Sequence, residues 1–291
     1  MRDVHYGGQA VIEGVMIRGA QHVAVAVRKP SGDIAVHSEP LPGGIYSGPL
    51  GRVPFLRGLT MLWDTLVLGT RALMFSADIA LEEEDVRFGG AVMWGTLLFS
   101  LGLGVGLFVL LPMLLVSLVD RYIATPLLSN LAEGIIRLSF FLAYLLLIGR
   151  LPDIRRVFAY HGAEHKTINA YESGVPLTPQ EVRAFTTVHT RCGTGFLLVV
   201  VLLFVLLSSL LGRPPFIWRL LSRLVLVPIV AALAYEFIKF TARHPNHPVI
   251  RVLVAPSLLL QRLTTREPED GMLEVSISAL QRVLQEDGVA A

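Results

Sequence analysis

The sequence predicts a mainly α-helical membrane bundle of about four transmembrane helices, with interfacial helices and a small β-rich piece at its N-terminus. Hydrophobic residues make up 53% of the 291 residues and charged residues only 16%, whereas soluble domains carry roughly a quarter charged residues. Long apolar runs account for this excess, because a helix in lipid is apolar on its outer faces. Several such runs follow residue 90, and a pattern of alternating apolar and polar residues precedes them.

The apolar runs predict the membrane helices. They cover approximately residues 91–119, 131–149, 195–211 and 220–240. A helix needs about 20 apolar residues to cross a hydrocarbon core of about 30 Å, so the third run is short and its flanks must supply the remainder. Pro112 and Pro228 lie inside runs, where neighbouring helices can satisfy the backbone groups that a proline leaves free.

Basic residues near the ends of these runs predict the orientation of the chain. The connection between the second and third runs carries the largest group, namely Arg150, Arg155, Arg156, Lys166, Arg183 and Arg191. Because cytoplasmic loops are enriched in arginine and lysine, we expect this connection and both termini in the cytoplasm. Three arginines oppose that bias, namely Arg213, Arg219 and Arg223. The sequence therefore predicts a multi-pass protein of the bacterial inner (plasma) membrane, with the lipid bilayer as its first partner.

This orientation places every histidine on the cytoplasmic side. The histidines are His5, His22, His37, His161, His165, His189, His244 and His247. The single cysteine, Cys192, cannot form an intramolecular disulfide, so the polar parts need no oxidising compartment. Residues capable of chemistry are therefore expected at one face of the membrane.

Residues 1–54 predict a small β-rich cytoplasmic piece. Residues 22–28 alternate between apolar and polar, residues 30–33 have the composition of a turn, and residues 34–39 return as a second strand. Before them lies a glycine-rich stretch that contains Glu13 and Arg18, both candidate site residues. Its glycines indicate close approach of the backbone to a ligand or to the bundle, and a tight structural turn is the alternative.

Residues 55–88 predict a helix that lies in the membrane interface or packs on the bundle. Arg57, Asp64, Arg71 and Asp78 recur every seven residues, so they lie on one helix face, and the other faces are apolar. A fifth membrane span is the alternative.

The chain after the bundle predicts two further segments. Residues 249–263 are apolar but short and contain Pro256, which indicates an interfacial or re-entrant segment. An amphipathic helix follows, and its apolar face is formed by Leu273, Ile277, Leu280 and Leu284. The predicted organisation is residues 1–54, 55–88, 89–248 with a cytoplasmic helix and loop at 150–194, and 249–291.

The sharpest chemical signal is the segment His161-Gly162-Ala163-Glu164-His165, inside a stretch that predicts a helix over residues 153–172. Residues four apart lie on the same helix face, so the two imidazoles can bind one divalent metal. Glu164 can orient or deprotonate a water, as in the H-x-x-E-H order of inverted zincins. We expect Zn²⁺ or another divalent metal here, with Glu164 as the catalytic base. The alternative is a polar helix face whose histidines bond to carbonyls or carboxylates.

A catalytic metal site requires a third protein ligand, and three residues compete for this position. Glu236 lies in the fourth run, where a carboxylate is costly unless it is paired or ligating. An ion pair with Lys239 or a nearby arginine is its alternative role. His189 and Cys192 lie just before the third run, and an inert buried thiol is the alternative for Cys192.

Two further residues are candidates around this site. Glu172 shares a helix face with His165 but lies two turns away, about 10 Å, so it would serve a second ion or the substrate. Arg191 is a candidate because it lies between His189 and Cys192.

Four stretches of the chain, taken together, resemble one protein family. They are Gly7–Gly19 (GGQAVIEGVMIRG), His161–Glu172 (HGAEHKTINAYE), His189–Phe196 (HTRCGTGF) and Gln261–Leu280 (QRLTTREPEDGMLEVSISAL). In this order they are similar to the YqhQ-like bacterial membrane proteins, an uncharacterised family described as predicted metal-dependent enzymes. The resemblance covers almost the whole chain and implies an inner-membrane protein with a metal site, but no particular substrate.

These observations favour a membrane-embedded metal-dependent hydrolase, such as a peptidase, with its site at the cytoplasmic membrane face. The alternative is a non-catalytic scaffold that binds a protein partner through the glycine-rich stretch, the β-rich piece and the C-terminal helix. A transporter fits less well because few ionisable residues lie at membrane depth, unless the chain forms a homo-oligomer. The net charge of +2 gives no indication of nucleic-acid binding.

Overall fold

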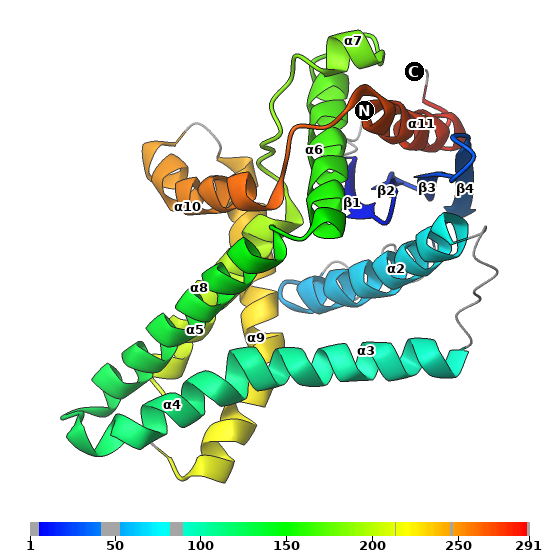
Figure 1. Ribbon diagram of the computed structural model, residues 1–291. Helices are drawn as coiled ribbons and strands as arrows, with labels where there is room; N and C mark the ends of the chain where they lie inside the picture. The colour runs from blue at the N-terminus through cyan, green and yellow to red at the C-terminus, as the bar shows by residue number, and fades with distance from the viewer. Residues whose placement is uncertain (1–5, 42–52, 82–89, 213, 245–246, 290–291) are drawn as a thin grey trace.

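The computed structural model describes residues 6–41, 53–81, 90–212, 214–244 and 247–289. In this part of the chain, a bundle of apolar helices extends from a layer that contains a four-stranded sheet (Figure 1). The predicted class, a mainly helical membrane bundle with a small N-terminal β piece, is confirmed.

The N-terminal sheet is an antiparallel meander in the order β1-β2-β3-β4. Its strands are β1 (Gly7–Val11), β2 (Gly14–Arg18), β3 (His22–Arg28) and β4 (Ile34–Pro40). The predicted return of the chain after β3 is confirmed, and Val25 lies opposite His37 in the register. Gly32 adopts a φ of +93° in the connecting turn, which glycine tolerates because it has no Cβ.

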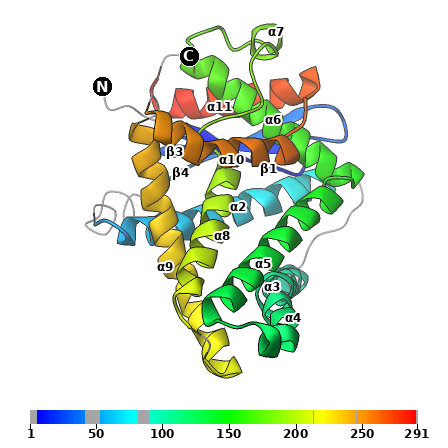
Figure 2. The ribbon, with the colours of Figure 1, turned by 90° about the vertical axis from the view of Figure 1, so that its left-hand side faces the viewer.

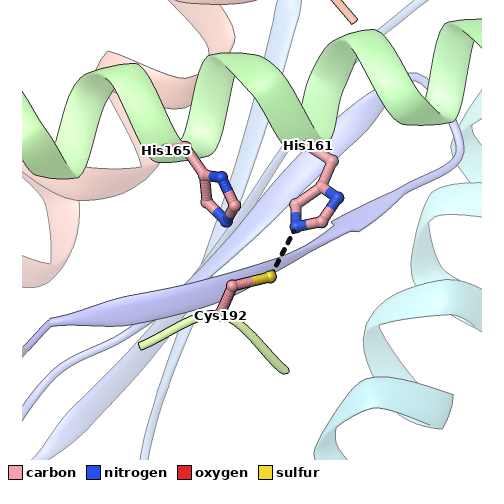
Figure 3. A group of neighbouring side chains, drawn as sticks. All are labelled: His161, His165 and Cys192. Atoms are coloured by element: carbon pink, nitrogen blue, oxygen red, sulfur yellow. Dashed lines mark hydrogen bonds between the residues drawn. The ribbon is translucent and has the colours of Figure 1, made fainter. Parts of the chain in front are cut away.

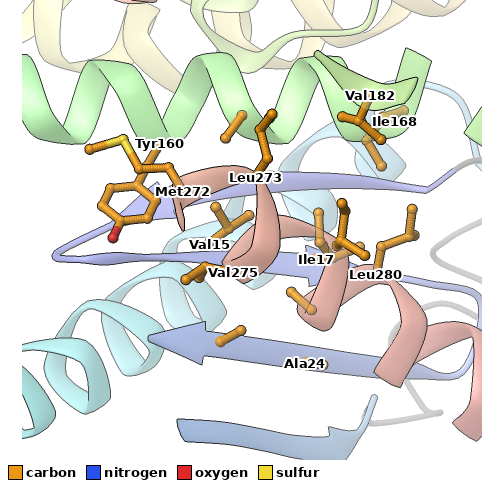
Figure 4. Close-up of a cluster of buried hydrophobic side chains, with 14 of the residues drawn as sticks. Val15, Ile17, Ala24, Tyr160, Ile168, Val182, Met272, Leu273, Val275 and Leu280 are labelled. Atoms are coloured by element: carbon orange, nitrogen blue, oxygen red, sulfur yellow. The ribbon is translucent and has the colours of Figure 1, made fainter. Parts of the chain in front are cut away.

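Helices cover both faces of this sheet. They are α2 (Leu56–Ala80), α6 (Pro152–Glu172) and α11 (Asp270–Glu286), and the short α7 (Pro179–Val182) packs against α6 and α11. The side chains of β2 alternate, since Val15 and Ile17 pack with α6 and α11 (Figure 4), whereas Met16 packs with α2 on the other face. The end of the predicted segment 55–88 lies outside the described residues.

The predicted apolar face of the C-terminal helix forms much of the core between α11, α6 and the sheet (Figure 4). Leu273, Leu280 and Leu284 have no exposed surface, and Ile277 keeps only 5%. Full burial of each such side chain contributes about 1.5–3 kcal/mol. The helix α11 is therefore a structural part of the layer and completes a core that begins with the N-terminal strands.

The bundle contains the four predicted apolar segments. The first is a continuous rod of four elements, namely α3 (Gly90–Val105), the π-helix η3 (Gly106–Leu110), α4 (Leu111–Val119) and the 3₁₀ turn η4 (Asp120–Tyr122). The other three segments are the helices α5 (Pro126–Ile148), α8 (Gly193–Ser209) and α9 (Phe216–Arg243). Within the described residues, Trp94–Tyr122, Pro126–Ile148 and Phe216–Thr241 are long and apolar enough to cross a membrane, and α8 is a shorter apolar helix of 17 residues. The outer surfaces expose large apolar side chains such as Phe99, as contact with lipid requires.

Two helices differ from the sequence prediction. The helix α5 begins earlier, at Pro126, because the Thr125 hydroxyl accepts a hydrogen bond from the Leu128 amide and proline suits the first helical turn. The segment after the bundle is a continuous helix, α10 (Pro248–Thr264), which Pro256 does not interrupt. This helix lies across the end of the bundle (Figures 1 and 2).

The buried face of α11 generates a stability prediction. Leu280→Ala leaves a cavity in the core and should lower the free energy of unfolding by about 2–5 kcal/mol, measured by thermal unfolding of the purified protein in detergent. The neighbouring exposed Gln281→Ala is the control and should change it by less than about 0.5 kcal/mol. Equal melting temperatures for the two variants would show that α11 does not stabilise the layer.

Candidate metal centre

The helix α6 presents the two predicted metal-binding histidines side by side. Pro152 at the first helical turn and Asp153 beside it favour the start of this helix. The ring centroids of His161 and His165 lie 4.4 Å apart, and both rings point toward the segment that precedes α8 (Figure 3). The predicted helix and the predicted pairing of its histidines are confirmed.

Cys192 completes a group of three possible metal ligands. Its Sγ lies 3.2 Å from His161 Nε2 (Figure 3), and one ligand atom from each of Cys192, His161 and His165 lies within 4.8 Å of the others. Tetrahedral zinc, with bonds of about 2.0–2.1 Å to nitrogen and 2.3 Å to sulfur, places its ligand atoms about 3.3–3.6 Å apart. These three residues could therefore hold a metal ion after small side-chain movements.

Backbone carbonyls determine which imidazole nitrogen is available in each ring. His161 Nδ1 lies 2.8 Å from the carbonyl oxygen of Thr264, and His165 Nδ1 lies 2.6 Å from that of Thr187. A carbonyl only accepts hydrogen bonds, so each Nδ1 carries the proton and each neutral ring has its lone pair on Nε2. This arrangement is the usual support for a metal-binding histidine. The carbonyl contacts expected of a merely polar helix face are thus present, and they leave both Nε2 atoms able to bind a metal.

The position of the Thr264 carbonyl, which accepts the hydrogen bond from His161, depends on a close approach between α6 and the segment after α10. The Arg266 amide donates to the Phe158 carbonyl at 2.9 Å, which places this segment alongside α6. A Cβ at Gly162 would overlap the Arg266 carbonyl oxygen. The glycine inside the histidine motif therefore permits the contact that orients His161.

Glu164 lies beside the three-residue group. Its side chain is 5% exposed, and its Oε2 lies 3.6 Å from His165 Nε2. The strand β1 covers it from the other side, because a Cβ at Gly8 would lie 3.2 Å from Glu164 Cγ. A buried carboxylate at this position can accept a proton from a molecule bound near the His165 ring.

His189 and Glu172 form a second layer around the group. The His189 amide donates to Gln261 Oε1 and its carbonyl accepts from Gln261 Nε2, both at 2.9 Å. The His189 ring lies 5.8 Å from that of His165, and its Nε2 lies 3.5 Å from Glu172 Oε2. Burial lowers the pKa of His189, which favours a neutral ring. Glu172 also pairs with Arg191, so these residues support the loop before α8.

The structure does not bring Glu236 to the histidines. Its carboxylate accepts hydrogen bonds from both Arg57 Nε, at 2.7 Å, and Arg57 Nη2, and from the backbone amide of Phe55 at 3.1 Å. Glu236 therefore forms an ion pair with a nearby arginine, which is the alternative role expected from the sequence. The charge of Glu236 is compensated at the start of α2, and Cys192 is the candidate ligand that lies beside the two histidines.

The glycine-rich stretch forms the β1–β2 hairpin, which joins α6 to α2. Glu13, at the turn, has a φ of +51° and accepts hydrogen bonds from Arg156 Nε at 2.6 Å and from Tyr160 OH at 3.3 Å. On the other side, Arg18 Nη1 lies 3.6 Å from the buried carboxylate of Asp64. Both candidates therefore fix the hairpin between helices, in agreement with the structural alternative for this stretch.

Three supporting residues were not singled out by sequence reasoning. They are Thr187, Gln261 and Thr264, of which the two threonines contribute only a backbone carbonyl to the contacts described above. Residue type does not reveal which backbone carbonyls will accept hydrogen bonds. In the sequence, Gln261 and Thr264 stood out only as part of the stretch Gln261–Leu280 that carries the family resemblance.

A family model described as "Protein of unknown function (DUF1385)" matches residues 53–286, which include all of the residues of the candidate metal centre. The chain belongs to this family. It is also 32% identical over 293 residues to "Uncharacterized protein YqhQ" of Bacillus subtilis (strain 168), with 96% of this chain and 92% of that protein covered. No solved structure matches. The DUF1385 match and this relative agree with the resemblance that the four sequence motifs indicate.

The three-residue group generates a prediction about metal content. The purified wild-type protein should carry about one zinc per chain, and a His161→Ala/His165→Ala double variant should carry almost none, as measured by inductively coupled plasma mass spectrometry. Cys192→Ser should lower the metal content to an intermediate level because it removes one ligand. His244→Ala, at an exposed histidine, is the control and should match wild type. Equal, sub-stoichiometric metal in wild type and double variant would contradict a metal centre.

The contact at Gly162 generates a second prediction. Gly162→Ala pushes the Arg266 carbonyl away and displaces the adjoining Thr264 carbonyl from His161, so metal affinity should fall by about 10–100-fold. A competition titration with a chromogenic zinc chelator measures this affinity. Gly193→Ala is the matched control, because nothing lies within 4 Å of a Cβ at that position. If both variants retain wild-type affinity, the carbonyl contact does not tune the site.

Proposed function

We propose that this protein is a metal-dependent hydrolase of the bacterial inner membrane, with its site at the cytoplasmic membrane face. The observation that carries the proposal is the convergence of His161 Nε2, His165 and Cys192 Sγ, with both Nδ1 atoms engaged by backbone carbonyls. The distribution of arginine and lysine between the connections supports the cytoplasmic location.

The donor set favours zinc among the divalent metals. Imidazole nitrogen and thiolate sulfur are the ligands that zinc prefers, whereas magnesium and calcium prefer oxygen. Three protein ligands leave a fourth position for water or substrate, as in catalytic rather than structural zinc sites. A zinc ion bound here would supply a Lewis acid that polarises a carbonyl or phosphoryl oxygen and acidifies water.

Glu164 is the residue we assign as general base. Its carboxylate lies next to the His165 Nε2 atom but outside the three-residue group, so it can take a proton without occupying a ligand position. This agrees with the H-x-x-E-H order, in which the glutamate acts on water and the histidines hold the metal. The neutral His189, held by Gln261, keeps the neighbouring loop and Cys192 in place.

The position of the group in the fold indicates where a substrate would reach it. Cys192 is the N-cap of α8, the short apolar helix, and Thr264 is the last residue of α10, which exposes apolar side chains such as Val252. The group therefore lies at the level where the apolar surface of the bundle begins. A hydrolase at this level would act on a peptide or other substrate at the membrane surface.

The general base can be tested separately from the metal ligands. Glu164→Gln should retain zinc and lower hydrolysis by about 10²–10⁴-fold, whereas the double histidine variant should lose both. Zinc content, hydrolysis of a peptide library by the purified protein, and rescue of a deletion strain are the measurements. Glu181→Gln, at an exposed glutamate of α7, is the control. Full rescue by Glu164→Gln would instead favour a non-catalytic protein that binds a partner through this face.

A further inference from the structure

A second group of charged residues lies inside the bundle. Glu133 and Arg137 belong to α5, and Arg223 belongs to α9. These three residues are only 1%, 5% and 0% exposed, respectively. Among the fully buried side chains of the described residues, that of Arg223 is the largest by volume. Ionisable residues are rare inside membrane bundles and commonly mark functional sites.

One carboxylate is shared by the two arginines. Glu133 Oε1 accepts a hydrogen bond from Arg137 Nη2 at 2.7 Å and from Arg223 Nε at 3.3 Å, and Glu133 Oε2 accepts from Arg223 Nη2 at 3.3 Å. Arg223 Nη2 also donates to Asn130 Oδ1 at 2.9 Å. The two guanidinium groups therefore meet at a single negative charge.

Arg137 also holds the irregular part of the first membrane rod. Its Nε donates to the carbonyl of Phe108 at 2.7 Å, and Phe108 lies in the π-helix η3. A π-helix shifts the backbone hydrogen-bonding pattern and is often found at functional sites. The other side of the guanidinium lies over the ring of Phe204, 4.5 Å from its centroid. The arginine is thus fixed by three helical segments.

In each of these two arginines, the buried Nη1 amino group has no hydrogen-bond partner in the described structure. Nearby, Arg219 Nη2 lies 3.1 Å from Asp120 Oδ2, and the other oxygen of Asp120 accepts from Ser129. Among the described residues, Arg137 and Arg223 pair with the single carboxylate of Glu133, which gives this group a net charge of +1, while Arg219 pairs separately with Asp120. Water could satisfy the free N–H groups, whereas an anion would satisfy them and also compensate the charge.

We infer that this group, the bundle arginine site of Arg137 and Arg223 with Glu133 and Asn130, binds a phosphate-type oxyanion. An uncompensated buried charge is costly in a bundle surrounded by lipid, and guanidinium groups match the geometry of phosphate oxygens. The free Nη1 atoms supply the donors. The oxyanion comes from an anionic lipid headgroup or from free phosphate.

The location of the bundle arginine site makes it distinct from the metal centre. Asn130 Nδ2 donates to the carbonyl of Gly212, in the connection between α8 and α9, so the site lies near the end of α8 that is opposite Cys192. A helix of 17 residues separates the two ends, or about 25 Å at 1.5 Å per residue. Asp120, on the outer side of the group, is 17% exposed and marks its connection to the surface.

The test is anion-dependent stabilisation of the full chain purified in a non-ionic detergent. The probes are inorganic phosphate, phosphatidylglycerol in mixed micelles and phosphatidylcholine in mixed micelles, with sodium chloride at matched ionic strength. At a hundredfold excess over Kd, a binding probe should raise the melting temperature by about 5 °C. A response to phosphate identifies a free anion, and a response to phosphatidylglycerol but not to phosphatidylcholine identifies a lipid headgroup.

Asn130→Asp is the decisive variant because it supplies the missing negative charge from within the protein. Its carboxylate would replace the amide oxygen that lies 2.9 Å from Arg223 Nη2. We expect it to lose at least tenfold in apparent affinity for the probe. Its melting temperature without probe is not the readout, because the substitution also removes the Asn130 Nδ2 donor to the Gly212 carbonyl. Gln281→Glu adds the same charge at an exposed position of α11 and should respond like wild type.

The inference would be overturned by either of two results. One is an unchanged wild-type melting temperature with both phosphate and phosphatidylglycerol, or an equal shift with phosphatidylcholine or chloride. The other is an Asn130→Asp variant that responds to the probe as strongly as wild type does. A Glu133→Gln variant, which increases the positive charge, should bind the probe more tightly, and weaker binding by folded protein would also count against the site.

Discussion

The hydrogen bonds from two imidazole Nδ1 atoms to backbone carbonyls are the interactions on which the candidate metal centre depends. Without them, each ring could turn or carry its proton on the other nitrogen, and the two Nε2 atoms would not both be available. The carbonyls come from Thr264 and Thr187, which belong to segments on either side of α8 and α9. The centre therefore exists only when three parts of the chain pack together.

The rigidity of this arrangement comes from the opposite face of α6. Tyr160, Ala163 and Ala170 lie in the core between the helix, the sheet and α11, and each is at most 1% exposed. A close-packed core leaves little freedom for the helix to shift. The histidines on the polar face are therefore held in a fixed position by the packing of the apolar face. The hairpin that carries Glu13 and the helix α11 thus contribute to the metal centre by holding α6, although neither supplies a ligand.

The bundle combines an apolar exterior with a charged interior at the end opposite the metal centre. Arg137 links α5 to the π-helix of the first rod, and Arg223 links α9 to Glu133 of α5. These contacts connect three of the four apolar segments through polar groups that lipid cannot satisfy. Polar groups buried in this way specify one arrangement of helices, because a shift of one turn would leave each of them unpaired. The protein therefore has two polar centres at opposite ends of α8, each built between helices.

The sequence alone determined the features that local order encodes. The membrane helices, the returning strand after His22–Arg28, the apolar face of α11 and the pairing of His161 with His165 all follow from periodicities within one segment. The tertiary structure decided which partners those segments meet. His161 lies 31 residues from Cys192 and 103 residues from Thr264, and nothing in local composition distinguished Cys192 from Glu236 as the residue that lies beside the two histidines. Glu236 is compensated by Arg57 and Glu133 is shared by two arginines because of helix packing, and contacts of this kind depend on the whole fold rather than on spacing along the chain.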